Sequence, residues 1–182
     1  MSKAIWSADR RQKILRALKP SPTTLILIGL IAYLWFRPPA WVSDQSTPVA
    51  PFTVRPVNGE PYAFDSLRGK VVLVNFWASW CPYCRHEMPA MQKFYDEHRS
   101  RGFAIVAFSA DATAAEAEKY LRQHGYTFQT AMSEPEHTAV FGDVARLPTS
   151  FIVDKRGRIR KKIIGQVHYA RLEKLVLPLL SE

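Results

Sequence analysis

The sequence predicts an α/β domain in which a mixed sheet is flanked by helices, and a membrane-spanning helix before that domain. Three observations carry this prediction. Apolar, strand-like runs alternate with helical segments through the middle of the chain, which is typical of parallel strands joined by helices. Two further strand-like runs flank a turn near the C-terminus, as antiparallel strands do. An uncharged apolar run near the N-terminus has the character of a membrane span.

The N-terminal segment divides into a basic tail over 1–19 and a transmembrane anchor over 20–36. The tail carries more than half of the chain's formal net charge of +9, so the basic balance does not point to nucleic acid. Basic flanks stay on the cytoplasmic side. The expected protein is therefore a single-pass protein of the cytoplasmic (inner) membrane, its N-terminus inside and its domain on the periplasmic, extracytoplasmic side. A cleaved signal peptide and a buried soluble helix are the alternatives.

Residues 37–51 are rich in proline and polar residues and predict a semi-rigid linker. The domain is expected over 52–182. Its central strand over 71–77 is continuously apolar, which indicates burial on both faces. The remaining predicted elements are, in order, strands at 52–54 and 62–64, a helix from Cys81 to about Arg99, a strand at 103–108, a helix at 113–124, a strand at 126–131, a short helix at 136–142, strands at 151–153 and 159–164, and a helix at 168–180.

The chain has only two cysteines, Cys81 and Cys84, and both lie where the central strand meets the next helix. Free N–H groups and the helix dipole stabilise a thiolate at a helix N-terminus. We assign Cys81 as an exposed nucleophile and Cys84, one turn deeper, as the resolving thiol. A structural disulfide is the plainer alternative, but a bridge that closes so short a loop removes little chain entropy.

Metal and haem interpretations of the two thiols are weaker. Zinc needs four ligands and the chain has a single CxxC. Haem attachment needs a histidine directly after Cys84, where Arg85 stands. Copper(I) suits thiolates, so a copper-binding or metallochaperone module that uses Cys81 and Cys84, with or without His86, stays open as a different class of function. We expect no metal and no cofactor for the leading interpretation.

The stretch Val72–Pro89, which contains Trp80-Cys81-Pro82-Tyr83-Cys84, resembles the active-site region of membrane-anchored thioredoxin-like proteins of the TlpA/ResA/CcmG (DsbE) type. Leu147-Pro148-Thr149 resembles the cis-proline loop of that fold, and Phe151-Ile152-Val153-Asp154 followed by Gly157 resembles its hairpin. The resemblance covers about residues 52–182. It implies a thioredoxin-like fold and a thiol–disulfide oxidoreductase.

The resemblance also implies residue roles. The catalytic pair is Cys81 and Cys84. Asn75 stands where thioredoxin has a buried acid, and Glu87 is either the replacement proton acceptor or a solvated helix carboxylate. Trp77 is expected in the core. The residues expected to support the site or contact substrate are Trp80, Pro82, Tyr83, Glu87, Leu147, Pro148 and Thr149.

The leading function is reduction of disulfides in client proteins, with cytochrome c maturation or another oxidoreductase as the setting. An oxidising compartment then requires a membrane electron donor that keeps the pair reduced. A disulfide-donating oxidase would use the same residues. The basic cluster between Lys155 and Lys162 predicts a solvated hairpin, with attraction to an acidic partner or anionic lipid as the alternative.

Overall fold

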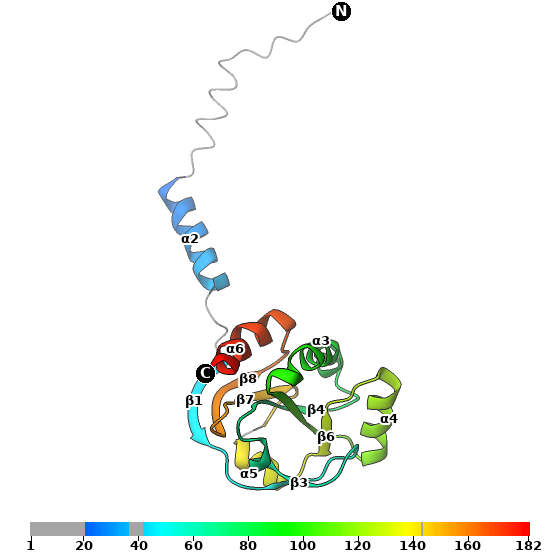
Figure 1. Ribbon diagram of the computed structural model, residues 1–182. Coiled ribbons are helices and arrows are strands. Elements are labelled where there is room, and N and C mark those ends of the chain that lie inside the picture. Colours follow the sequence, from blue (N-terminus) through cyan, green and yellow to red (C-terminus); the bar gives the residue numbers. More distant parts are fainter. Residues whose placement is uncertain (1–20, 37–41, 143) are drawn as a thin grey trace, which may run out of the picture. The chain divides into compact units, whose positions relative to one another are not determined.

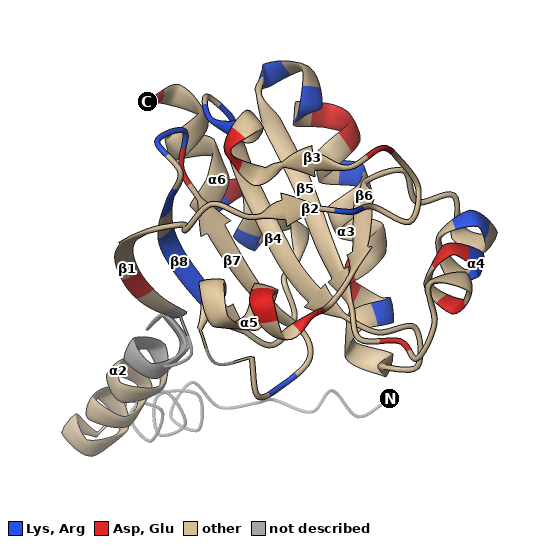
Figure 2. Cartoon of the chain, turned by 90° about the horizontal axis from the view of Figure 1, so that it is seen from below, with Lys and Arg blue, Asp and Glu red and all other residues tan. Residues whose placement is uncertain are grey.

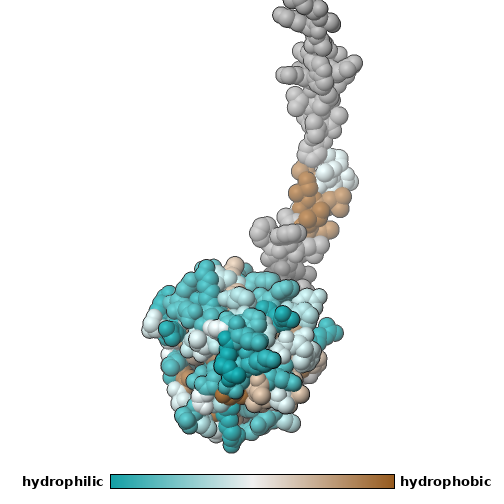
Figure 3. All heavy atoms as spheres, turned by 90° about the vertical axis from the view of Figure 1, so that its right-hand side faces the viewer, coloured by the Kyte–Doolittle hydropathy of each residue, from teal (hydrophilic) through white to brown (hydrophobic). Residues whose placement is uncertain are grey.

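A computed structural model describes residues 21–36, 42–142 and 144–182, and the predicted basic tail lies outside these ranges. The chain divides into two units, residues 1–39 and 40–182. In the first unit, helix α2 (Pro22–Phe36) covers most of the predicted anchor. Figure 3 shows its apolar surface. At least half of the residue surface is exposed in Leu25, Ile26, Leu27, Ile28, Leu30 and Ile31.

The sequence predicted that residues 20–36 span a membrane. Within the ranges that the structure describes, no helix combines the length and the apolar character that a membrane crossing requires.

The second unit is built on a six-stranded sheet with the order β1-β8-β7-β4-β5-β6 (Figure 1). The central strand β4 pairs in parallel with β5, which pairs in parallel with β6. Strands β7, β8 and β1 continue the sheet in antiparallel pairs. The predicted mixed sheet is therefore confirmed. The strands are β1 (Val42–Pro48), β4 (Val71–Trp77), β5 (Phe103–Ser109), β6 (Gln129–Met132), β7 (Thr149–Val153) and β8 (Arg158–Ile164).

Helices cover both faces of this sheet (Figure 1). Helices α3 (Pro82–His98) and α6 (Tyr169–Ser181) bury Met88, Phe94 and Val176 against one face, and α4 (Ala114–His124) extends that layer. Helix α5 (Pro135–Phe141), the pair β2 (Thr53–Val54) and β3 (Tyr62–Ala63), and the short helix η1 (Phe64–Leu67) cover the other. All residues of β4 are buried, as the apolar run predicted.

Strand β1 corrects the predicted linker over 37–51. Most of its residues are polar, yet it pairs with β8 at the edge of the sheet, with Val42 opposite Ile163 and Pro48 opposite Arg158. Pro48 is tolerated because the last residue of an edge strand need not donate to the ladder. The side chains of Asp44 and Lys161 also form an ion pair. The sheet therefore begins about ten residues before the predicted domain start at Phe52.

Strand β6 also differs from its prediction, since it begins at Gln129 rather than at Tyr126. Gly125 ends α4 in the left-handed conformation, and the N–H of Tyr126 donates to the carbonyl of Leu121. Tyr126 therefore completes the helix end rather than starting the strand. A 3-10 turn, η2 (Arg99–Arg101), follows α3.

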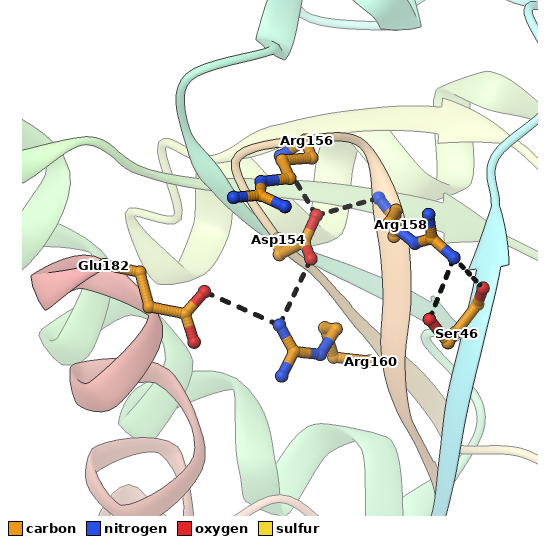
Figure 4. A network of polar contacts seen from close by, with 6 residues as sticks. All are labelled: Ser46, Asp154, Arg156, Arg158, Arg160 and Glu182. Atoms are coloured by element: carbon orange, nitrogen blue, oxygen red, sulfur yellow. Dashed lines mark hydrogen bonds and ion pairs between the residues drawn. The ribbon is translucent and has the colours of Figure 1, made fainter.

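The basic turn between β7 and β8 is organised by one buried carboxylate, Asp154 (Figure 4). One of its oxygens accepts from the backbone N–H groups of Arg156 (3.0 Å) and Arg158 (2.9 Å). The other accepts from Arg160 at 3.3 Å, which also pairs with Glu182. Strand β8 is rich in Lys and Arg residues, which are blue in Figure 2. Basic side chains of β8 therefore form ion pairs within the domain, as Arg160 does with Asp154 and Glu182.

Replacing Asp154 with alanine is expected to lower the free energy of unfolding by about 1–3 kcal/mol, because two backbone donors lose their partner. Chemical denaturation measures this loss. Asp96→Ala is the matched control, since Asp96 accepts only a side-chain hydrogen bond on an exposed helix surface. Equal stability of the two variants would contradict the organising role of Asp154.

Candidate active site

The two cysteines lie at the junction of β4 and α3. Cys81 is the N-cap residue of α3, and its sulfur accepts a hydrogen bond from the N–H of Cys84 at 3.3 Å. Both thiols are free. Cys81 is only 5% exposed and Cys84 is fully buried. The prediction of an exposed nucleophile is therefore wrong, because Cys81 packs within the same core cluster as Cys84 and Met88.

Burial raises the pKa of the Cys84 thiol well above its ordinary value, and its hydrogen bond with Cys81 and the charge of Glu87 act in the same direction. The thiolate of Cys84 is disfavoured because a charge without water around it is costly. Cys84 is consequently a protonated thiol at neutral pH and has to lose its proton before it can attack a disulfide.

Glu87 lies on α3, one turn beyond Cys84, and it is completely buried. The alternative of a solvated helix carboxylate is therefore wrong. Asn75 donates to its Oε1 at 2.8 Å, and the backbone N–H of Val167 donates to its Oε2 at 2.7 Å. Burial raises the pKa of Glu87 to about 8, although both hydrogen bonds act to lower it. A carboxyl group with this pKa exchanges its proton near neutral pH.

The loop before β7 contains the expected cis-proline. The peptide bond between Leu147 and Pro148 is cis. Thr149 is the first residue of β7, and its hydroxyl donates to the carbonyl of Arg146 at 2.7 Å. Leu147 packs against the core cluster that contains Cys81 and Cys84. The cis-proline loop and the segment that contains Cys81 and Cys84 thus share one hydrophobic core.

The aromatic residues that lie near the thiols in the sequence differ in exposure, and Trp77 is in the core as predicted. Trp80 and Tyr83 are about two-thirds exposed, whereas Trp77 is fully buried. The carbonyl of Tyr83 accepts a hydrogen bond from the side-chain amide of Gln166 at 3.1 Å. Trp80 and Tyr83, the chain neighbours of Cys81 and Cys84, are therefore exposed although both thiols are buried.

Asp111 is a residue of the site that sequence reasoning missed. Its carboxylate, 6% exposed, accepts from the N–H of Ser79 (3.0 Å), from the Ser79 hydroxyl (2.7 Å) and from the Ser109 hydroxyl (2.7 Å). It thereby fixes the loop that leads into Cys81. The available signal was an acid two residues after the end of an apolar strand, at the sheet edge where β4 also ends.

Replacing Asp111 with asparagine is expected to reduce the rate of disulfide exchange by roughly ten-fold, because small displacements of a reacting group are costly. The amide offers one acceptor oxygen to a cluster of donors that a carboxylate satisfies with two. The rate of alkylation of Cys81, followed against pH, measures the effect. Asp96→Asn is the control, and unchanged alkylation in D111N would show that the loop does not need this carboxylate.

The copper alternative uses the two thiols, with His86 as an optional third ligand. In residues 21–36, 42–142 and 144–182, no group of three or more His, Cys, Asp or Glu side chains is placed to hold a metal ion. His86 instead lines a surface hollow together with Pro82 and Tyr126. The predicted third ligand is thus not grouped with Cys81 and Cys84.

Two thiols at the start of a helix, beside a cis-proline loop, are the arrangement expected of a thioredoxin-like fold. Comparison with known proteins shows that the protein is a thiol–disulfide oxidoreductase of this fold. Within that class the chain belongs to the Redoxin family, whose model matches residues 44–175.

Relatives and solved structures agree with this assignment. The chain is 34% identical over 154 residues to a thiol-disulfide oxidoreductase ResA of Bacillus cereus, covering 82% of this chain and 88% of the relative. It is 29% identical to sporulation thiol-disulfide oxidoreductase A of Bacillus subtilis, over 82% of this chain and 91% of the relative. A thiol:disulfide interchange protein of Chlorobium tepidum superposes with a TM-score of 0.70 at 31% identity, covering 76% of this chain and 99% of that one.

Proposed function

We propose that the protein reduces disulfides in client proteins through the pair Cys81–Cys84. The observation that carries this proposal is the buried carboxyl group of Glu87, whose charge adds to burial in raising the pKa of the Cys84 thiol. A base beside Cys84 speeds attack by Cys84 on a mixed disulfide. That attack returns the client in its reduced form, whereas an oxidase needs the client's own second thiol to resolve the intermediate.

The reaction then proceeds in two exchanges. The Cys81 thiolate attacks one sulfur of the client disulfide, a mixed disulfide forms, and the other client sulfur leaves as a thiolate. Glu87 accepts the proton of Cys84, and the Cys84 sulfur attacks Cys81. The Cys81–Cys84 bond forms and the second client thiolate leaves. Two electrons pass to the client, and a donor must return two electrons to the enzyme.

The supporting residues have roles in this scheme. The backbone of Leu147, directly before the cis-proline Pro148, would pair with an extended client segment beside Cys81, as the resemblance to the TlpA/ResA/CcmG group implies. Trp80, Pro82 and Tyr83 would form the contact surface around the sulfur. The same resemblance implies that the clients belong to cytochrome c maturation or that the client is another oxidoreductase.

We place this reaction on the extracytoplasmic side of the cytoplasmic membrane, with a membrane electron donor. The exposed apolar side chains of α2 and the basic residues before it support attachment through 20–36. Cell fractionation with alkaline carbonate extraction, combined with protease treatment of spheroplasts, tests the placement. A carbonate-soluble chain that is protected from the protease would contradict it.

The redox state of the pair in growing cells tests the direction of electron flow. Rapid acid quenching followed by alkylation separates the dithiol from the disulfide by mass. A reductase is expected to be mostly dithiol when its donor is present, and to become disulfide when electron supply is blocked. A pair that rests as a disulfide under normal growth would instead support the disulfide-donating oxidase.

A further inference from the structure

We propose that clients dock beside Cys81 through an acidic segment, which binds in a cationic groove between α3 and α4. This inference rests on the proposed function, because it names the class of client that the same site accepts. The groove consists of two adjoining hollows of about 420 and 290 Å³. Arg85, Tyr120 and His124 line both of them.

The groove is continuous with the residues that flank the nucleophile. Pro82, directly after Cys81, lines the larger hollow, and Ser79, two residues before it, lines the smaller. Arg85 lies one turn along α3, and its N–H donates to the carbonyl of Cys81 at 3.1 Å. A peptide whose sulfur reaches Cys81 therefore has neighbouring residues within reach of Arg85.

The fixed charge of the groove is positive. Arg85 and Lys119 line it, and within the described part of the chain neither side chain forms an ion pair with an acid. Among the described residues that line the groove, Glu116 is the one acid, and its Oε2 already accepts from the N–H of Thr113 in the capping box of α4. Unpaired cations beside a reacting centre favour an anionic partner and speed its encounter.

The walls of the groove are aromatic and ordered. The rings of Tyr120 and His124 lie 4.2 Å apart, and His124 Nδ1 is 2.9 Å from the carbonyl of Tyr120. His124 also stacks on Tyr126, with an angle of 12° between the rings. Such a wall loses little side-chain entropy on binding. The favoured client segment therefore combines Asp or Glu with an apolar or aromatic residue near its disulfide.

Three peptides that contain an intramolecular disulfide test this inference with the full-length protein. They are identical except that the residues next to the cysteines are Asp, Asn or Lys, and kcat/KM for their reduction is measured at two salt concentrations. The acidic peptide is expected to exceed the neutral one by about three- to ten-fold, and the lysine peptide to fall below it. High salt should narrow the difference.

Reversing the charge of the two cationic residues of the groove tests the inference most directly. Lys119→Glu and Arg85→Glu are each expected to remove or invert the ratio of the rates for the acidic and neutral peptides. This ratio is the readout because a charge near Cys81 can change the thiol itself, and such a change acts on both peptides alike. Arg156→Glu is the matched control and should keep the wild-type ratio, since Arg156 lines a different hollow on the β7–β8 hairpin.

The outcomes separate the two proposals. Reduction of all three peptides at equal rates would overturn the acidic-client inference and leave the reductase proposal intact. Failure to reduce any of them would overturn the reductase proposal. An acidic preference that persists in both groove variants would place client recognition elsewhere on the domain.

Discussion

Replacing Cys81 with serine is expected to abolish disulfide exchange, with a loss of roughly a thousand-fold or more, because a serine hydroxyl does not supply the reactive anion that a thiolate does. Replacing Cys84 has a different consequence. Cys84→Ser keeps the attacking sulfur but removes the one that resolves the intermediate. The variant should therefore accumulate mixed disulfides between Cys81 and its clients.

Non-reducing electrophoresis and mass spectrometry distinguish these two results. C84S should show adducts that disappear with reductant, and C81S should show none. The double variant C81S/C84S is the control for adducts formed by other thiols. Adducts on Cys84 in the C81S variant, at levels equal to those of C84S, would contradict the assignment of Cys81 as nucleophile. This test is needed because Cys81 is almost as buried as Cys84, so exposure alone does not identify the nucleophile.

Replacing Glu87 with glutamine is expected to slow resolution of the mixed disulfide by roughly ten-fold or more and to remove a rate increase centred near pH 8. The reason is that Glu87, whose pKa burial raises to about 8, gains the ability to accept the Cys84 proton as it ionises. Single-turnover mixing with a peptide disulfide, repeated from pH 6 to pH 9, measures this profile. Glu60→Gln, an exposed carboxylate, is the matched control.

Stability supplies an independent check of the same residue. The folded-state pKa of Glu87 lies above its unfolded value of 4.5, so the native state binds more protons between these two values. The contribution of protonated Glu87 to the free energy of unfolding is fully present below about pH 4.5 and is lost as pH rises toward about 8. The loss is on the order of 5 kcal/mol. In E87Q this dependence of the free energy of unfolding on pH should disappear. If the free energy of unfolding of E87Q depends on pH as it does in the wild type, another group causes that dependence.

The centre of the fold was predictable from sequence because its signals are local. The apolar run of β4 has to be buried on both faces, and Cys81 follows it after three residues, at the start of a helix. The cis-proline at 148 followed from a resemblance of sequence motifs, and the structure confirms it. These features depend on residues next to one another in the chain.

The features that sequence reasoning missed depend on pairing across the fold. Strand β1 has a polar composition, and it is a strand because β8 offers an unpaired edge. Asp111 contacts Ser79 only because β4 and β5 end at the same side of the sheet. The sequence of α3 alone does not show whether Glu87 is buried. Its second hydrogen-bond partner is the N–H of Val167, which follows β8 and is far away in the chain.

The equilibrium reduction potential of the Cys81–Cys84 pair tests the central claim most directly. The full-length protein in detergent is equilibrated with a series of dithiothreitol or glutathione buffers, and the dithiol fraction is measured after alkylation. A reductase fed by a membrane donor predicts a potential near the roughly −270 mV of thioredoxin. A potential toward the roughly −120 mV of a strong oxidant would contradict the proposed direction of electron flow and identify a disulfide donor.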